Sequence, residues 1–380
     1  MHVAVIGRGL IGSAAARHLA RAGHEVTLIG PDEPEALETH RGVFGSHYDE
    51  GRITRGIDPY PFWSRVSRAS IARYGEIETD SGIRFYTERG ILMAGPEGGE
   101  PIRNVGRVAE ASGIPCEQLG DAALASRFPW FHFPEGTLGY HETKDSGFIS
   151  PRALVQAQGI AAEKAGARIV AATATGFHET GGGVEVETDG GTITADELLI
   201  AAGGFTNGLL DEALPLSVLA RTVALFELDG AEVARLKGMP PLIYLYPSGE
   251  DPYLLPPILY PDGRWYLKLG GDRVDLRLET EQDRRDWFRS GGSAEVGEML
   301  TAQIRDRIPG LAIRSIHVKP CVTTYTPSNH PIIDRLGPRV SVAVGGCGRG
   351  AKCSDELGRL GAEAALGRCD PDLALGAVGS

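Results

Sequence analysis

The sequence predicts an α/β fold: a Rossmann-like dinucleotide-binding domain interleaved with a second domain built on a mixed, antiparallel sheet. Three observations predict it. An apolar strand-like run at residues 3–6 leads through a glycine-rich turn into an alanine-rich helix that ends near Gly23. A second glycine-dense loop joins an alternating strand near residue 340 to a C-terminal helix. Between them, residues 221–228 and 242–276 are rich in Tyr, Leu, Val and Phe at strand-like spacing.

The first turn carries a GxGxxG motif, Gly7-Arg8-Gly9-Leu10-Ile11-Gly12, between a strand and a helix. Gly7 permits the tight turn, Gly9 lets a pyrophosphate approach the backbone, and Gly12 lets helix and strand pack closely. The N-terminus of the helix, predicted to run from Ser13 to Gly23, then offers free N–H groups to the phosphates, and Leu10 and Ile11 of the turn are expected to contact the cofactor.

Residues 24–29 form the second strand, and an acid is expected at its end to bind ribose hydroxyls. This chain has Gly30 there, so Asp32 is the predicted ribose ligand, with Glu33, a water or a main-chain contact as alternatives. The motif alone does not distinguish FAD from NAD.

The middle of the chain alternates helix and strand. Ser150 is the expected N-cap of a helix whose first turn contains Pro151. The elements in order are a helix at 151–165, a strand at 167–170, a hairpin of 184–188 and 191–195, and a buried strand at 197–204. That strand ends in small residues, so the backbone at Ala202 and Gly203 is expected to pass close to a ligand.

The C-terminal glycine loop, residues 345–350, precedes a helix predicted to begin near Ser354. A flavin needs such a loop, because main-chain donors and a helix N-terminus stabilise negative charge on the reduced ring. An ordinary strand–loop–helix connection is the alternative.

Composition limits the function classes. The 380 residues include 50 acidic and 38 basic side chains, giving a net charge of −12, which argues against nucleic-acid or anionic-membrane partners. No apolar run is long enough to span a bilayer, and no signal peptide is expected. The five cysteines include no CxxC pair, so we expect no disulfide framework, no metal site and a cytoplasmic location.

Together, the fingerprint, the strand at 198–204 followed by Phe205-Thr206-Asn207, and the glycine loop before Lys352 resemble the D-amino-acid-oxidase superfamily. Within it the likeness is to the monomeric sarcosine and N-methyltryptophan oxidases. The resemblance implies FAD and a monomer. It also implies a discontinuous FAD-binding domain (1–80, 141–220 and 311–380) and a substrate domain (81–140 and 221–310).

Four local matches imply roles for individual residues. In the segment 45–55, Ser46 and His47 are expected at the cofactor, Arg52 beside the flavin ring, and Arg55 on the substrate carboxylate. In Leu267-Lys268-Leu269-Gly270, Lys268 is expected to meet the flavin edge through water and to activate dioxygen. The alternatives are a solvated arginine pair and a lysine on the solvent side of an edge strand.

The other two matches lie near the C-terminus. Cys321, nine residues before His330, matches the cysteine joined to the flavin 8α-methyl, although a cysteine in isolation is more often a small buried hydrophobe. Lys352 matches a lysine that pairs with the substrate carboxylate, and Tyr253 is expected at the substrate. Gly346, Gly348 and Gly350 form the expected main-chain cradle of the flavin.

The sequence also departs from the sarcosine oxidases. Gly271-Asp272 stands where they have a substrate-binding histidine, Tyr48 replaces a second histidine, and Thr323 replaces a tyrosine. Sarcosine is therefore not carried over as substrate. The expected reaction is oxidation of an amine by hydride transfer to flavin, with dioxygen reduced to hydrogen peroxide. The alternatives are a flavin dehydrogenase for D-amino or 2-hydroxy acids with another acceptor, an NAD-dependent dehydrogenase, and a non-catalytic flavin-binding protein.

Overall fold

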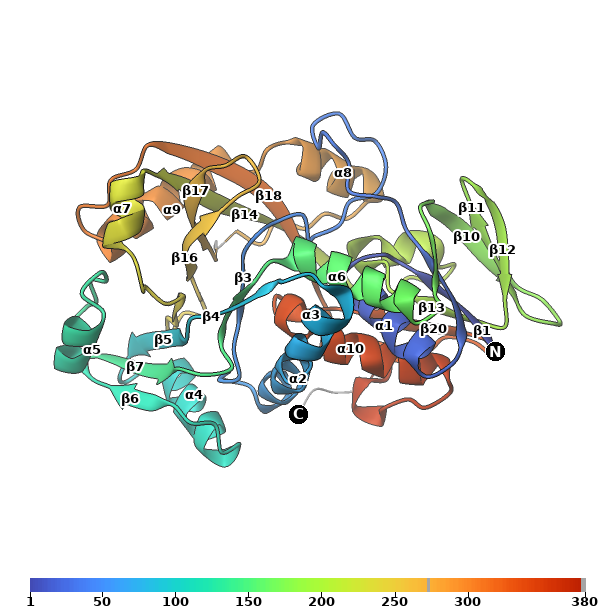
Figure 1. Ribbon diagram of the computed structural model, residues 1–380, viewed down its shortest axis with the longest axis horizontal. Coiled ribbons are helices and arrows are strands. Elements are labelled where there is room, and N and C mark those ends of the chain that lie inside the picture. The colour runs from blue at the N-terminus through green and yellow to red at the C-terminus, as the bar shows by residue number, and fades with distance from the viewer. Residues whose placement is uncertain (272–273, 377–380) are drawn as a thin grey trace.

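The computed structural model describes residues 1–271 and 274–376 and confirms the predicted α/β fold. Two large sheets form opposite halves of the molecule along its long axis (Figure 1). The first sheet has six strands, in the order β19 (Ile332–Arg335), β20 (Val340–Val344), β13 (Glu197–Ile200), β1 (His2–Ile6), β2 (Glu25–Ile29) and β9 (Arg168–Val170). All neighbours are parallel except β19 and β20.

Strand β1 is buried on both faces, as its continuous apolar run predicts. Val3 and Val5 pack towards helices α1 (Leu10–Arg21) and α10 (Gly350–Ala365). Ala4 and Ile6 pack instead against a small sheet on the opposite face. That sheet consists of β10 (Ala174–Glu179), β11 (Val184–Thr188) and β12 (Gly191–Ala195), and it contains the predicted hairpin.

The second large sheet has eight strands. Their order is β18 (Ser315–Tyr325), β14 (Ser217–Leu228), β17 (Trp265–Gly270), β16 (Tyr253–Leu259), β15 (Leu242–Tyr244), β5 (Ile91–Pro96), β7 (Thr137–Glu142) and β6 (Glu117–Leu119). Neighbouring strands are antiparallel except β5 and β15. A three-stranded sheet, β3 (Arg52–Thr54), β8 (Gly147–Ile149) and β4 (Tyr86–Glu88), is a separate smaller sheet.

The remaining elements are helical. They are α2 (Pro61–Ile71), α3 (Tyr74–Ser81), α4 (Glu100–Ala111), α5 (Asp121–Arg127), α6 (Pro151–Lys164), α7 (Gly230–Arg235), α8 (Glu281–Arg289), α9 (Ala294–Arg307) and the 3₁₀ helices η1 (Gly203–Leu209) and η2 (Pro371–Leu373). The hydroxyl of Ser150 accepts a hydrogen bond from the Ala153 N–H at the start of α6, so this predicted cap is confirmed.

Some boundaries differ from the prediction. Helix α10 begins at Gly350, one turn earlier than the expected start near Ser354. Strand β13 ends at Ile200, and the predicted continuation to residue 204 instead enters η1. Gly203 has a φ of +56°, which ends the extended conformation and turns the chain along the sheet edge.

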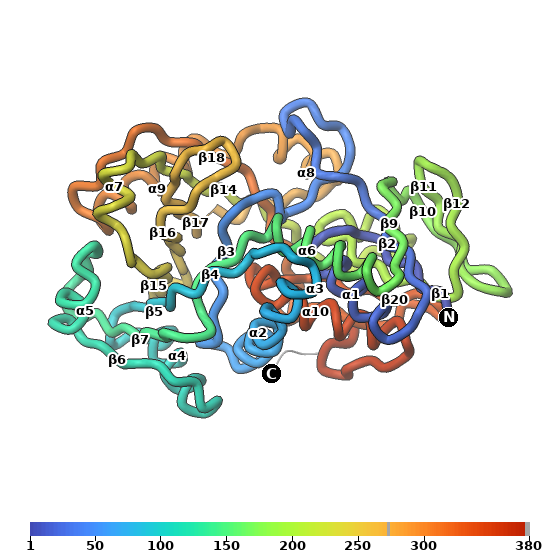
Figure 2. Tube along the Cα trace, in the orientation of Figure 1, coloured from blue at the N-terminus to red at the C-terminus, as the bar shows by residue number. Residues whose placement is uncertain are grey.

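Segments from the two ends of the sequence pack together, because helices α1 and α10 lie side by side (Figure 2). Helices α1 and α10 approach so closely that a Cβ on Gly358 would lie 2.5 Å from the Ala14 Cβ. A buried network reinforces this contact, because Arg17 donates to Asp355 at 2.9 Å and to Gln158 at 2.7 Å. Both helices therefore start at the same edge of the six-stranded sheet.

Candidate active site

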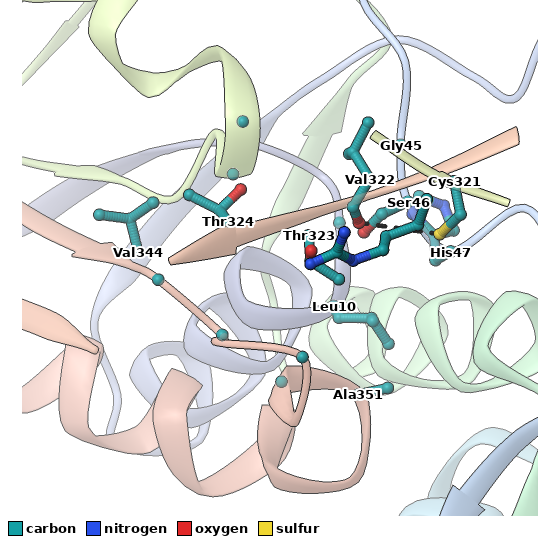
Figure 3. Close-up of a pocket in the computed structure, with 18 of the residues that line it drawn as sticks. Leu10, Gly45, Ser46, His47, Cys321, Val322, Thr323, Thr324, Val344 and Ala351 are labelled. Carbon is teal, nitrogen blue, oxygen red and sulfur yellow. Dashed lines mark hydrogen bonds between the residues drawn. The ribbon is translucent and has the colours of Figure 1, made fainter. Parts of the chain in front are cut away.

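A cavity of about 1140 Å³ opens at the carboxyl edge of the six-stranded sheet and extends towards strands β14 and β18. It exceeds the roughly 300–1,000 Å³ of ordinary small-molecule pockets. Figure 3 shows Cys321 of β18 beside Ser46 and His47, with Thr323 of the same strand nearer Leu10. The site is thus built from both large sheets and the loop that precedes β3.

The first glycine turn has the shape that a dinucleotide pyrophosphate requires. Gly7 has a φ of +112°, and a Cβ there would lie 2.3 Å from the Ala201 carbonyl oxygen. A Cβ on Gly12 would lie 1.9 Å from the Gly7 carbonyl oxygen. At Gly9 the nearest contact of a Cβ is His47 Nδ1 at 3.9 Å, so the backbone there faces open space. This cradle fits FAD, because a side chain at Gly9 would fill the place left for the phosphates.

Two helix N-termini face the same cavity. Helices α1 and α10 begin after Gly9 and Arg349, and neither of these residues provides a side-chain cap. Their first N–H groups and positive dipole ends are therefore available to negatively charged groups of a ligand. The hydroxyl of Thr323 lines the cavity and is buried without a hydrogen-bond partner among the described residues, so it too is available to a ligand.

Arg52 brings the loop before β3 against Cys321. One guanidinium nitrogen donates to the Ser46 carbonyl at 3.2 Å and lies 3.5 Å from the Cys321 sulfur. The other donates to the Gly51 carbonyl at 3.0 Å and to the Asp49 carboxylate. The thiol is half-buried at the cavity wall, beside a fixed positive charge.

His47 completes this end of the cavity. The surrounding protein removes water from the imidazole and, with the charge of Arg152, lowers its pKa to about 3. The ring is therefore neutral near pH 7.

Lys268 lies in the interior of β17 with no exposed surface. Its ammonium group donates to the Gly51 carbonyl at 2.7 Å and to the Asp49 carboxylate. Burial lowers its pKa well below the ordinary value, and the nearby charge of Arg52 lowers it further. The Asp49 carboxylate thus binds Lys268, Arg52 and Tyr260. The Tyr260 hydroxyl donates to this carboxylate at 2.8 Å.

The other end of the cavity concentrates positive charge around Asp58. One oxygen of this fully buried carboxylate lies 2.9 Å from Arg55 Nη2, 3.2 Å from Lys352 Nζ and 3.5 Å from Arg349 Nε. Burial alone would raise the pKa of Asp58, but the charges of Lys352, Arg349 and Arg55 outweigh it and hold the pKa at about 2. Burial lowers the pKa of both Arg55 and Lys352.

Most residues predicted from the sequence line this one cavity. They are Gly7, Gly9, Leu10, Ile11, Ser46, His47, Arg52, Arg55, Ala202, Gly203, Tyr253, Cys321, Gly346, Gly348, Gly350 and Lys352. Gly12 lies behind the turn, where it packs against Gly7, and Lys268 lies behind the 49–51 segment. Asp32 is not in the wall, and its exposed carboxylate forms an ion pair with Arg8 at 2.7 Å. Asp272 lies outside the described residues.

Sequence reasoning missed Asp49, Asp58, Arg349 and Asp251. Asp251 lines the cavity, and its carboxylate makes no hydrogen bond or ion pair within the described residues. One signal for Arg349 was available in the sequence. A charged residue inside the glycine loop lies at the N-terminus of the following helix, where a ligand is expected. Among the described residues, no cluster of His, Cys, Asp or Glu side chains is arranged to hold a metal ion. Across those same ranges, no helix has the length and apolar character to cross a membrane.

Comparisons with known proteins agree with this geometry. The chain is 27% identical over 369 residues to an N-methyl-L-tryptophan oxidase of Salmonella heidelberg (strain SL476), covering 96% of this chain and 94% of the relative. Among solved structures, NikD, an amino acid oxidase essential for nikkomycin biosynthesis, matches with a TM-score of 0.77 at 20% identity, covering 98% and 96% of the two chains. Amadoriase I from Aspergillus fumigatus, a fructosyl amine:oxygen oxidoreductase, has the same fold, with a TM-score of 0.72 at 19% identity, covering 98% and 88%.

The family model described as FAD dependent oxidoreductase matches residues 2–364, nearly the whole length of the chain. The cavity, its two glycine loops and its two helix N-termini are the features that such a cofactor requires. The chain belongs to the FAD dependent oxidoreductase family.

Proposed function

We propose that the protein oxidises a secondary or N-methyl amino acid and that dioxygen accepts the electrons, giving hydrogen peroxide. The observation that carries this proposal is the geometry at Asp58. Arg55 and Lys352 approach one carboxylate oxygen of Asp58 at 2.9 and 3.2 Å. The two cations are therefore placed to hold a substrate carboxylate by charge-assisted hydrogen bonds.

The chain's own residues bind and orient. Arg55 and Lys352 fix the substrate carboxylate, which limits the positions open to the amine and its α or N-methyl carbon. Tyr253, at the start of β16, lines the same cavity. The glycine loops, the two helix N-termini and Thr323 would hold FAD. When bound, FAD accepts a hydride equivalent from the substrate and passes the electrons on.

We further propose that Cys321 forms a covalent link to the flavin, as the resemblance implies. The thiol lies at the cavity wall, 3.5 Å from the guanidinium of Arg52, so it can reach a flavin bound in the cavity. In this proposal, residues 1–80, 141–220 and 311–380 bind the cofactor, and residues 81–140 and 221–310 shape the substrate end.

One observation favours a second candidate, a flavin dehydrogenase that uses another acceptor. Lys268, expected to activate dioxygen, is bonded to Asp49 and to the Gly51 carbonyl and lies outside the cavity wall. In this arrangement its charge is partly neutralised by Asp49. In the oxidase proposal Lys268 acts on dioxygen from outside the cavity wall, because a buried charge still acts over several ångströms.

The deciding experiment mixes FAD-loaded protein with N-methyl amino acids without oxygen and follows loss of the flavin absorbance. Air or a quinone dye is then added, and recovery of the absorbance and peroxide are measured. The oxidase proposal expects recovery in air with one peroxide per turnover, and Lys268→Met should slow it by about 10²-fold while flavin reduction changes less. Recovery with the dye alone would favour the dehydrogenase. Flavin that no amine reduces would contradict both.

A further inference from the structure

The positive end of the cavity contains one more cation than a simple carboxylate clamp needs. Arg349, in the glycine loop before α10, approaches the same Asp58 oxygen as Arg55 and Lys352, at 3.5 Å. The Nε atoms of Arg55 and Arg349 are both buried without a hydrogen-bond acceptor among the described residues. Both side chains line the cavity, so an acidic group of a ligand can reach them.

Arg349 is held in place independently of Arg55 and Lys352. Its guanidinium lies 4.8 Å from the centre of the Tyr60 ring, in cation–π geometry, and only 19% of the side chain is exposed. Its Nη1 donates to the Cys347 carbonyl at 3.5 Å, whereas its buried Nε has no acceptor, and a buried polar group without a partner costs free energy. Because Asp58 already serves Arg55 and Lys352, it cannot satisfy the planar fork of Arg349 as well.

Several other lining arginines are paired with carboxylates. Arg8 pairs with Asp32 at 2.7 Å, Arg221 with Asp275 at 2.7 Å, and Arg285 with Glu281 at 2.6 Å. Arg277 also lines the cavity, but it is exposed to solvent, whereas the cations around Asp58 are largely withdrawn from it.

The charges around Asp58 can be counted. Arg55, Lys352 and Arg349 are positive, while Asp58 and Asp251 are negative when ionised, so these five groups carry a net charge of +1; Glu142, on which the charges of Arg55 and Lys352 also act, has a pKa of about 7 and adds a negative charge above it. Asp251 lies close enough for the charges of Arg349 and Arg55 to act on it, but it pairs with neither in the described residues. An amino acid with one carboxylate places it between Arg55 and Lys352 and leaves the Nε donor of Arg349 without an acid partner. A second acidic group on the ligand supplies that partner.

We propose that the substrate is an amino acid with a second acidic group: its α-carboxylate lies between Arg55 and Lys352, and Arg349 binds the second group. This inference deepens the proposed function and rests on it for the identity of the ligand as a substrate. Arg349 is then a specificity residue, which selects dicarboxylic over monocarboxylic amines.

Binding of compounds that cannot be oxidised tests this site without turnover. Calorimetric titrations of the FAD-loaded protein would compare succinate and glutarate with their monoamides, succinamate and glutaramate, which keep the shape and lose one charge. We expect each diacid to bind roughly 10- to 100-fold more tightly than its monoamide, the range for a hydrogen bond to a charged group. In Arg349→Gln this ratio should fall towards one, and Arg349→Lys should restore part of it.

Arg314→Gln is the matched control, because Arg314 is 63% exposed and lies outside the cavity wall. The Arg314→Gln variant should keep the wild-type ratio of diacid to monoamide affinity. Equal binding of diacid and monoamide, or a diacid preference that survives Arg349→Gln in protein that still binds flavin, would overturn the inference.

Flavin reduction separates this inference from the proposed function. The same variants would be mixed without oxygen with N-methylaspartate and with N-methylasparagine, its uncharged counterpart. Reduction by both amines at equal kcat/KM would overturn the diacid inference and leave amine oxidation standing. Arg349-dependent diacid binding with no reduction by any amine would overturn the proposed function and leave the diacid site standing.

Discussion

At the scale of single residues, the chemistry at one end of the cavity depends on how Arg52 and Cys321 meet. The guanidinium of Arg52 donates hydrogen bonds to the Gly51 and Ser46 carbonyls and to Asp49. These bonds hold its positive charge beside the Cys321 sulfur. The Cys321 thiol is only half-buried and lines the cavity, so a flavin bound there can reach it. Cys347 lines the same cavity, but burial raises the pKa of its thiol.

Cys321→Ala should therefore abolish covalent flavin attachment, while Cys347→Ala should leave it intact. The measurement is the flavin colour after acid precipitation, together with the mass of the denatured chain. Wild-type protein and Cys347→Ala should retain the colour in the pellet and show the added mass of FAD. A wild-type pellet without colour and a bare chain mass would contradict the linkage and leave non-covalent FAD binding as the alternative.

At the scale of elements, Glu142 joins the end of β7 to the segment that carries Arg55 and Asp58. Its carboxylate accepts hydrogen bonds from the Gly56 N–H at 3.0 Å and the Ile57 N–H at 3.2 Å. Burial raises the pKa of Glu142 to about 7, against the opposing effect of these donors. In the unfolded chain Glu142 has an ordinary glutamate pKa near 4.5 and loses its proton at a lower pH. The folded protein thus keeps a proton on Glu142 at pH values where the unfolded chain has released it.

The sign of the resulting pH dependence follows directly. Between pH 4.5 and 7 the folded state binds more protons at Glu142, so its contribution to the free energy of unfolding falls as the pH rises. A shift of this size corresponds to about 3 kcal/mol. Glu142→Gln should remove this decline in urea-unfolding curves measured from pH 5 to 8. The exposed Glu97→Gln is the control, and an unchanged pH slope in Glu142→Gln would contradict the assignment.

Asp355 has the opposite behaviour at the junction of α1, α6 and α10. It accepts from Arg17 and Gln158, both at 2.9 Å, and it also pairs with Arg73. Burial alone would raise the pKa of Asp355, but hydrogen bonding from His18 and the surrounding positive charges hold it far below the ordinary range. Its stabilisation is therefore complete above an ordinary aspartate pKa of about 4 and is lost as the pH falls below it.

Asp355→Asn should lower the free energy of unfolding near pH 7 by about 3 kcal/mol, because it removes the buried negative charge that Arg17 and Arg73 share and leaves Arg17 only the ion pair with the partly exposed Glu76. Asp306→Asn, at a side chain that is 71% exposed, should cost almost nothing in the same urea titration. Equal losses in the two variants would show that the Asp355 network contributes no more than a surface pair.

At the scale of the whole molecule, the features that could be predicted from the sequence were those that depend on residues close together in the chain. Gly7 and Gly12 are required by the backbone itself, so the first turn and its helix could be predicted before any contact was known. The pairing of Asp58 with Arg349 joins residues from opposite ends of the chain, and nothing near either residue indicates the other. The ion pair of Lys268 with Asp49 also joins residues far apart in the sequence, 219 positions from each other. Long-range electrostatic partners become visible only when the fold brings them together.

The cavity wall draws on both large sheets, so FAD should stabilise the molecule as a single unit. Cys321→Ala protein can be prepared with and without bound FAD and compared by calorimetry. A ligand present at 1,000 times its Kd adds about 4 kcal/mol, which for a chain of this length raises Tm by about 5 °C. We expect one transition that moves up with FAD concentration, because β1 and β18 contribute to the same binding site. Two transitions, of which only one responds to FAD, would mean that the halves unfold independently and that the cofactor contacts only one of them.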